Sequence, residues 1–546
     1  MPFALSNICR HRALLVTSLL LLGFCSLVAG RFATADDSAN YPAPSLTAPA
    51  DPAALIARGK YLVTAADCAP CHTGPNHAPF TGGLVMNTPF GGLATPNITP
   101  DAATGIGTWS DEDFYNALHY GVAPGHSWLI FPKFLYPAMP YTSYTKLSPA
   151  DVTAIKAYIF SLAPQQVAPT PSSMLFPFNQ RPVLLGWRIL FFRSGPMHMD
   201  PSWNENLKNG AYLTEALGHC AECHTPRNFL SAMESGNWLA GSAIDAFYAP
   251  NISSDKTYGV GGWSQADLVA YLHDDGNLSK GSPFGPMGDM TDHSTSLIPV
   301  SDDADIANYL QNATAPQSTP ASPAVDGGAA SAANGATVYA ANCAGCHGQT
   351  GGGMKPALVP NLAGNDSVTA SQPANVIGAV LSGLAPWNKG PAMPSFATQL
   401  SDQEIADVTN YVRTAWGNQG SADATPAQVL GLRGVAVVPP SADAAADALG
   451  CPHISGTGGV DSVADPGNGL LGIYEGATSA TMANRTATLI DAVRASNASI
   501  SDADLTNTLL AAYCPVVAHE AGLSLAGKQL ALRDFIAGAA PLVAAH

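Results

Sequence analysis

The stretch CAPCH at residues 68–72 decides how the rest of this sequence is interpreted. The same spacing of two cysteines and a histidine returns as CAECH at 220–224 and as CAGCH at 343–347. In a C-x-x-C-H motif the two thiols add to the vinyl groups of a haem, and the adjacent imidazole binds the iron. The predicted attachment sites of three covalently bound haem c groups are therefore Cys68, Cys71, Cys220, Cys223, Cys343 and Cys346, and the predicted iron ligands are His72, His224 and His347.

Paired cysteines also occur in zinc sites and in redox dithiols. A zinc ribbon needs two cysteine pairs about 15 to 20 residues apart, whereas these motifs are separated by 152 and 123 residues. The spacing, together with a histidine after each pair, favours haem.

Each motif lies in a repeated context, as a tandem array of one small domain would produce. A glycine followed by a tyrosine precedes every motif, in the pairs Gly59 and Tyr61, Gly210 and Tyr212, and Gly335 and Tyr339. After each motif comes a proline, at Pro96, Pro250 and Pro360. Its backbone carbonyl either accepts the second N–H of the iron-binding imidazole or belongs to a simple turn.

Each copy is predicted to close with a helix that carries a tyrosine on its apolar face, namely Tyr158, Tyr309 and Tyr411. These tyrosines are expected to pack against the glycine of the first helix, as part of the core. Ser148 and Ser401 are predicted N-caps, and Ser301 is predicted to open the helix of the second copy.

An iron bound by one histidine needs a sixth ligand if it is to transfer electrons without binding small molecules, and methionine favours a raised potential. Each copy offers a methionine just before its last helix. Met139, Met287 and Met393 are therefore the predicted sixth ligands, with Met290 as an alternative to Met287.

Composition excludes several classes of protein. Hydrophobic residues make up 47% and charged residues 12% of the 546 residues, which excludes disordered and coiled-coil chains. The formal net charge of −17 argues against nucleic acid as a partner.

The first 35 residues are predicted to be a secretory signal peptide. Arg10 and Arg12 precede an apolar run at 13–30, and an A-x-A site ends just before Asp36. The run is near the lower length limit of a membrane span, so an uncleaved anchor is the alternative. Export predicts a mature protein on the periplasmic side of the cytoplasmic membrane, where disulfides form.

A second apolar segment, at 176–192, is interrupted by Arg181, Pro182 and Arg188 and is not predicted to span a membrane. It is either a packed connection or an apolar surface for a partner or the membrane interface.

These motifs resemble those of the tri-haem cytochrome c subunit of membrane-bound dehydrogenases of acetic acid bacteria, a family that includes the subunits of quinoprotein alcohol, gluconate, sorbitol and aldehyde dehydrogenases. The likeness covers about residues 50–420 and is carried by 136–141 (YPAMPY), 211–228 (AYLTEALGHCAECHTPRN), 285–287 (GPM) and 339–347. It implies a subunit that takes electrons from a catalytic dehydrogenase subunit and delivers them to ubiquinone at the cytoplasmic membrane.

The expected fold is mainly α, with three tandem cytochrome c-type domains and a small helical C-terminal extension. The expected boundaries are 1–35 for the signal peptide, 50–170, 201–315 and 325–420 for the three domains, 171–200 for an apolar linker and 448–546 for the extension.

The extension departs from the family pattern and follows an Ala/Pro-rich linker around 437–446. It contains Cys451 and Cys514, for which a disulfide is expected in an oxidising compartment, and short helices are predicted at 481–495 and 524–537. A docking module and a stabilising appendage are equal alternatives for its role. The extension also makes a molybdenum-dependent, aldehyde-oxidising partner a rival to the quinoprotein alcohol dehydrogenase.

The expected activity is one-electron transfer, with no substrate chemistry on this chain. One alternative is a haem enzyme, such as a peroxidase or a thiosulfate-oxidising cytochrome, which needs an iron with an open sixth position. The other is a cytochrome that feeds a terminal oxidase.

Overall fold

The computed structural model describes residues 37–545 with several gaps. The predicted signal peptide and the linker around 437–446 lie outside the described residues. The gaps are 75–76, 129, 245–246, 275, 278–279, 355–358, 385–392, 434–450, 452, 455–461, 464–472, 475, 497–499, 501 and 521.

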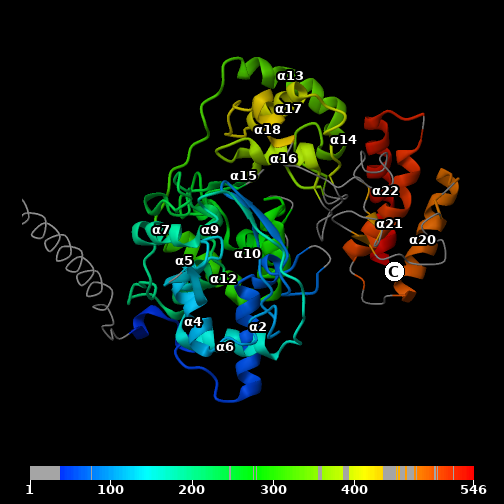
Figure 1. The fold of residues 1–546 in the computed structure, drawn as a ribbon. Helices are drawn as coiled ribbons and strands as arrows, with labels where there is room; N and C mark the ends of the chain where they lie inside the picture. Colours follow the sequence, from blue (N-terminus) through cyan, green and yellow to red (C-terminus); the bar gives the residue numbers. More distant parts are fainter. Residues whose placement is uncertain are drawn as a thin grey trace, which may run out of the picture.

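Residues 37–200 form the first group of elements, drawn from blue through cyan to blue-green in Figure 1. Its α-helices are α2 (Pro52–Ala65), α3 (Cys68–Cys71), α4 (Asp111–Tyr120), α5 (Tyr141–Tyr144), α6 (Pro149–Ser161) and α7 (Leu184–Phe191). Its strands form an antiparallel sheet of β1 (Val85–Thr88), β2 (Gly91–Ala94) and β5 (Ser173–Met174), and a hairpin of β3 (Val122–Trp128) and β4 (Phe131–Phe134).

The second and third groups repeat this order with fewer strands. The second contains α8 (Glu205–Tyr212), the π-helical turn η4 (Leu213–Leu217), α9 (Ala221–His224), the hairpin β6 (Ser242–Ile244) and β7 (Phe247–Ala249), α10 (Gln265–His273), α11 (Pro286–His293) and α12 (Val300–Asn312). The third contains α13 (Gly328–Asn342), α14 (Ala344–His347), α15 (Asp366–Thr369), α16 (Ala374–Ser382), α17 (Asp402–Thr414) and α18 (Pro426–Arg433).

In each group the helix before the C-x-x-C-H motif crosses the last long helix of the repeat, in the pairs α2 and α6, α8 and α12, and α13 and α17. A glycine makes each crossing possible. A Cβ on Gly59, Gly210 or Gly335 would lie 1.9, 2.0 or 1.9 Å from a backbone oxygen of the facing helix. It would lie 2.8, 3.0 or 2.8 Å from the Cβ of Tyr158, Tyr309 or Tyr411, so the predicted glycine–tyrosine packing is confirmed.

Two of the three predicted helix starts are confirmed. The side chain of Ser148 accepts a hydrogen bond from the backbone of Asp151, and Ser401 forms a capping box with Glu404. The third was wrong: α12 begins at Val300, so Ser301 lies inside its first turn and caps nothing. Pro299 occupies the N-cap position with an extended ψ of 136°, so the helix starts two residues earlier than a cap at Ser301 would place it.

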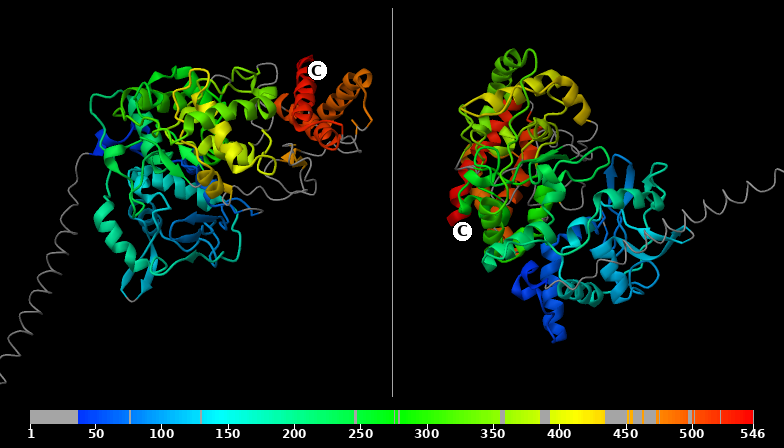
Figure 2. Two further views of the ribbon diagram at one scale, coloured as in Figure 1. Left: turned by 90° about the horizontal axis from the view of Figure 1, so that it is seen from above. Right: turned by 90° about the vertical axis from the view of Figure 1, so that its left-hand side faces the viewer.

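The first two groups share one hydrophobic core. It runs from Leu62 of α2 and Ile155 of α6 to Leu217 and Ile306 of the second group, and includes Met199 from the segment that joins them. The third group has separate clusters, one around Ile377 and Ile405 and one around Tyr339. Residues 37–315 are thus one packed body, and the views in Figure 2 show the third group lying against it.

The segment at 176–192 presents apolar side chains to solvent. Phe176, Ile189 and Leu190 are 79%, 50% and 61% exposed, and Leu175, just before the segment, is 61% exposed. Of the two predicted roles, the exposure favours a surface over a packed connection. None of the helices in the described part of the chain combines the length and the apolar character that a membrane crossing needs.

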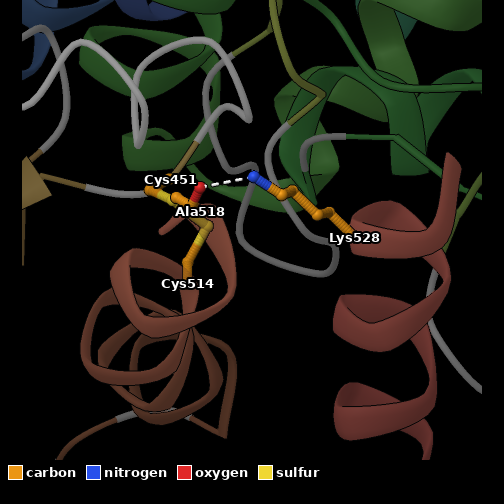
Figure 3. Close-up of a disulfide and its surroundings, with 4 residues drawn as sticks. All are labelled: Cys451, Cys514, Ala518 and Lys528. Atoms are coloured by element: carbon orange, nitrogen blue, oxygen red, sulfur yellow. Dashed lines mark hydrogen bonds between the residues drawn. A yellow bond between two sulfur atoms is a disulfide. The ribbon is translucent and has the colours of Figure 1, made fainter. Parts of the chain in front are cut away.

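In its described residues, the C-terminal extension contains a parallel pair of short strands, β8 (His453–Ile454) and β9 (Ser462–Val463), and the helices α20 (Ser479–Ser496), α21 (Asp502–Ala518) and α22 (Leu525–Ala545). Cys451 is disulfide-bonded to Cys514, as predicted. Beside this disulfide, Lys528 of α22 donates a hydrogen bond of 2.6 Å to the Ala518 carbonyl (Figure 3). Both helices are longer than predicted. α20 begins two residues earlier and ends one residue later, at Ser496, and α22 continues past 537 because Ala539 and Val543 are buried in the core of the extension.

Candidate haem sites

The first two motifs hold their histidine in the same way. The ring Nδ1 of His72 lies 2.9 Å from the carbonyl oxygen of Pro96, and Nδ1 of His224 lies 2.6 Å from that of Pro250. Because a carbonyl only accepts, Nδ1 carries the proton and donates it. This fixes the orientation of the ring and leaves Nε2 for a metal, as in other metal-binding histidines. The predicted role of the proline carbonyl is confirmed at both sites.

The third histidine differs in detail. Among the described residues, Nδ1 of His347 makes no hydrogen bond, although it is buried. Burial lowers the pKa of His347 to about 4, and the nearby Pro360 carbonyl acts in the opposite direction. Burial lowers the pKa of His72 and His224 as well. All three imidazoles are therefore neutral at pH 7, the form that binds iron.

The six motif cysteines are unpaired. Burial is the main cause that raises the pKa of Cys68, Cys220 and Cys343, each to about 12. A redox dithiol has the opposite property, because its attacking thiol is activated by a lowered pKa. The surroundings of these cysteines therefore suit stable covalent attachment better than thiol exchange.

One pocket brings the predicted groups of the third site together. Cys343, His347 and Met393 all line it, so a thiol, an imidazole and a thioether face one space. Most of the remaining wall is apolar, with Leu362, Val376, Val380, Leu384, Val408 and Val412 among its members. The residues present thus fit a porphyrin with histidine and methionine as iron ligands.

Met139 and Met287 are both partly buried against the core of the first two groups. Met139 lies in a turn whose backbone is held by Tyr136 and Tyr141, and Met287 is the second residue of α11. Their roles as iron ligands stay predictions. Met290 also stays an alternative, since its Cε lies 3.6 Å from where a Cβ on Gly218 would stand, just before the second motif.

The first two motifs lie against each other. α11, which carries Met287, packs on α3, the helix of the first motif. In return, Ser143 in the segment after Met139 donates a hydrogen bond of 3.2 Å to Glu222 of the second motif. Burial, Asp67 and then the Cys223 thiol raise the pKa of Cys71 to about 11. Each methionine-bearing segment thus contacts the cysteine motif of the other group.

The residues that join the second group to the third were not predicted from the sequence. Gly281, Ser282 and Phe284 belong to the second group but line the cavity at Cys343. Nearby, the Asn375 side chain accepts from the backbone N–H of Tyr248 at 2.8 Å and donates to its carbonyl at 2.9 Å. No local pattern signals these contacts, because the two partners lie 127 residues apart.

Comparison with known proteins agrees with this geometry. The family model for cytochrome c matches residues 56–163 and 332–416. The gluconate 2-dehydrogenase cytochrome c subunit of Pantoea cypripedii is 36% identical over 438 residues, which are 76% of this chain and 94% of that protein. The chain belongs to the family of dehydrogenase cytochrome c subunits. Proteins of this family carry covalently bound haem and transfer electrons.

Two further proteins are similar to this chain. The cytochrome c subunit of the quinone-dependent alcohol dehydrogenase of Gluconobacter oxydans (strain 621H) is 36% identical over 70% of this chain and 82% of its own length. A subunit of the nicotinate dehydrogenase of Pseudomonas putida is 37% identical over 66% of this chain, but the chain spans 30% of that longer protein.

Proposed function

We propose that this chain is a tri-haem electron-transfer subunit, with cytochrome c-type domains at 50–170, 201–315 and 325–420. The observation that carries the proposal is the repeated local geometry around the three motifs. The second region lies outside the two ranges that the family model matches, yet it has the same helix crossing at Gly210 and the same histidine–proline bond as the first. One haem c in each domain follows from this repetition.

A haem c bound at each site would supply a one-electron redox centre. The chain's own residues hold and close that centre. The carbonyls of Pro96 and Pro250 orient two of the imidazoles, and the apolar wall at the third site excludes water. Met139, Met287 and Met393 are the proposed sixth ligands. A closed sixth position favours an electron relay over a peroxidase or a thiosulfate-oxidising enzyme.

The packing of the three sites supports a continuous path. The first and second motifs meet in one core, and Phe284 of the second group reaches the cavity of the third. Electrons therefore need not leave the protein to pass between neighbouring centres. The proposed donor is a catalytic dehydrogenase subunit, either quinoprotein or molybdenum-dependent, and the proposed acceptor is ubiquinone. The names of the gluconate, alcohol and nicotinate dehydrogenase relatives support a dehydrogenase partner.

The exposed apolar surface supports docking on the periplasmic face of the cytoplasmic membrane, after export by the signal at 1–35. We call it the α7 surface. It consists of exposed Leu175, Phe176, Ile189 and Leu190 with Trp128 and Ile130 of the β3–β4 hairpin, which contacts the turn before α7. Lys133 of β4 and Arg193, which follows α7, are exposed on the same segments, in a chain of net charge −17. Apolar side chains among cations suit an anionic lipid surface.

The function is tested by purifying the complex from native membranes. We expect the chain to copurify with a large dehydrogenase subunit, and we expect substrate to reduce all of its haems before added ubiquinone analogue reoxidises them. A copurifying terminal oxidase, or haems that substrate leaves oxidised, would contradict the proposal. A carbon monoxide difference spectrum of the reduced protein separates the haem-enzyme alternative, because the relay predicts no binding at any of the three centres.

A further inference from the structure

The C-terminal extension packs against the third C-x-x-C-H motif. α22 contacts both α14, which carries Cys346 and His347, and the preceding helix α13. Figure 1 shows the extension on the α14 side of the third group. Arg533 of α22 donates through Nη1 to the backbone carbonyl of Gly345 at 3.2 Å, between the two cysteines of the motif. A residue 188 positions away is therefore anchored to the haem attachment loop.

The hydrophobic core of the extension is completed by residues of the third group. Val359, which is 7% exposed, belongs to the same buried cluster as Tyr474, Leu489 and Phe535 of the extension. Cys346 and Met354 are packed against this cluster. The two cysteines of the motif therefore have different neighbours. Cys343 faces the cavity that Met393 also lines, whereas Cys346 faces the extension.

Arg533 brings a positive charge to this contact. Its guanidinium also pairs with Asp534 at 2.6 Å, but the Asp534 side chain is 61% exposed and that of Arg533 only 27%. Solvent screens the more exposed charge more strongly, so the charge of Arg533 dominates at the motif.

We propose that the extension is the outer wall of the third haem site, and that Arg533 raises the reduction potential of the haem held there. The proposal rests on the proposed function, because it requires a haem at Cys343 and Cys346. Reduction adds an electron to the centre, and a nearby cation stabilises the reduced form relative to the oxidised form. The wall also keeps a partner protein from direct contact at Cys346, so electrons reach or leave the third site from its other sides.

The test is a spectroelectrochemical titration of the full-length holoprotein and three variants. Arg533→Gln removes the charge, and Arg533→Lys keeps it. Arg494→Gln is the matched control, because Arg494 pairs only within the extension in the bonds that the structure describes, with Asp502 at 2.7 Å and the Val543 carbonyl at 3.2 Å. The third haem is assigned beforehand as the centre whose spectrum changes in Met393→Ala.

We expect Arg533→Gln to lower the midpoint potential of the third haem alone, and we expect Arg533→Lys and Arg494→Gln to leave it within error of the original value. Three unchanged potentials in Arg533→Gln, or an equal fall in Arg494→Gln, would overturn the proposal. The haem content of each variant is measured by mass. If the unmodified protein carries no haem at Cys343 and Cys346, the proposed function itself is contradicted. If three haems are present and Arg533→Gln leaves all of their midpoint potentials unchanged, only the role of Arg533 is contradicted.

Discussion

The hydroxyl of Tyr212 donates a 2.7 Å hydrogen bond to the carboxylate of Asp151, and it accepts one of 3.0 Å from the backbone N–H of Ser148. Tyr212 ends α8 of the second group, while Ser148 and Asp151 start α6 of the first. Both side chains are buried, and Asp151 also pairs with Arg58 of α2 at 3.0 Å. The tyrosine that precedes the second haem motif therefore ties the first domain to the second.

The Tyr212→Phe variant tests this tie. Removal of the hydroxyl removes the hydrogen bond to the buried Asp151 carboxylate and leaves the Ser148 N–H unpaired. A buried hydrogen bond to a charged group contributes about 2 kcal/mol to stability. We expect the free energy of unfolding to fall by that amount in urea denaturation, with haem content unchanged. Tyr258→Phe, at a side chain 41% exposed, is the control and should change stability little. Equal stability of the two variants would show that the bond contributes nothing.

Substitution of Gly59 by alanine should damage the first domain. The new Cβ would lie 1.9 Å from the Ala154 carbonyl oxygen, so α2 and α6 must separate. We expect a loss of roughly 3 kcal/mol or more, by analogy with an overpacked core, and a smaller yield of protein with the first haem attached. Gly431→Ala in α18 has open space around its Cβ position and should be neutral or slightly stabilising. Normal stability in Gly59→Ala would refute the close crossing.

The α7 surface predicts binding to anionic vesicles. Replacement of Ile189 and Leu190 together by aspartate removes two apolar side chains and adds two negative charges, and burial of one such side chain contributes about 1.5–3 kcal/mol. We expect cosedimentation with phosphatidylglycerol vesicles to weaken by at least tenfold. Leu430→Asp, at another exposed leucine, is the control. If the unmodified protein, the double variant and the control bind the vesicles equally, the α7 surface is not the membrane-docking surface.

We expect removal of the Cys451–Cys514 disulfide to destabilise the C-terminal extension and to leave the rest of the protein unchanged. Cys451 and Cys514 are 63 residues apart, and closing a loop of that length adds around 4 kcal/mol on the chain-entropy model. The double Cys451→Ser, Cys514→Ser variant should therefore be cleaved faster by protease after residue 450 while it retains every haem. Equal cleavage with and without the disulfide would contradict this prediction.

The sequence predicted what is encoded locally. The haem motifs, the caps at Ser148 and Ser401 and the glycine–tyrosine crossings each depend on residues at fixed spacing in a repeat. The cap at Ser301 failed because Pro299 occupies the N-cap position. The shared core of the first two groups, the contribution of Phe284 to the third site and the contact of Arg533 with Gly345 were not predictable. Each joins segments far apart in the chain, and no periodicity records which surfaces meet.

The methionine ligands give a direct prediction about potential. In Met139→Ala the thioether that stabilises reduced iron is lost, while Cys68, Cys71 and His72 remain to hold the haem. We expect the haem to stay attached and the midpoint potential of that one centre to fall in a redox titration. A titration curve identical to that of the unmodified protein would refute Met139 as a ligand.

The central claim is that this chain is a relay of three haems, each closed by imidazole on one side and thioether on the other. The most direct measurement combines the intact mass of the purified mature protein with its low-temperature magnetic circular dichroism spectrum. We expect a mass that includes three haem c groups and a spectrum of low-spin, histidine–methionine iron at all of them. A mass with fewer than three haems, or reduced centres that are mostly five-coordinate, would contradict it.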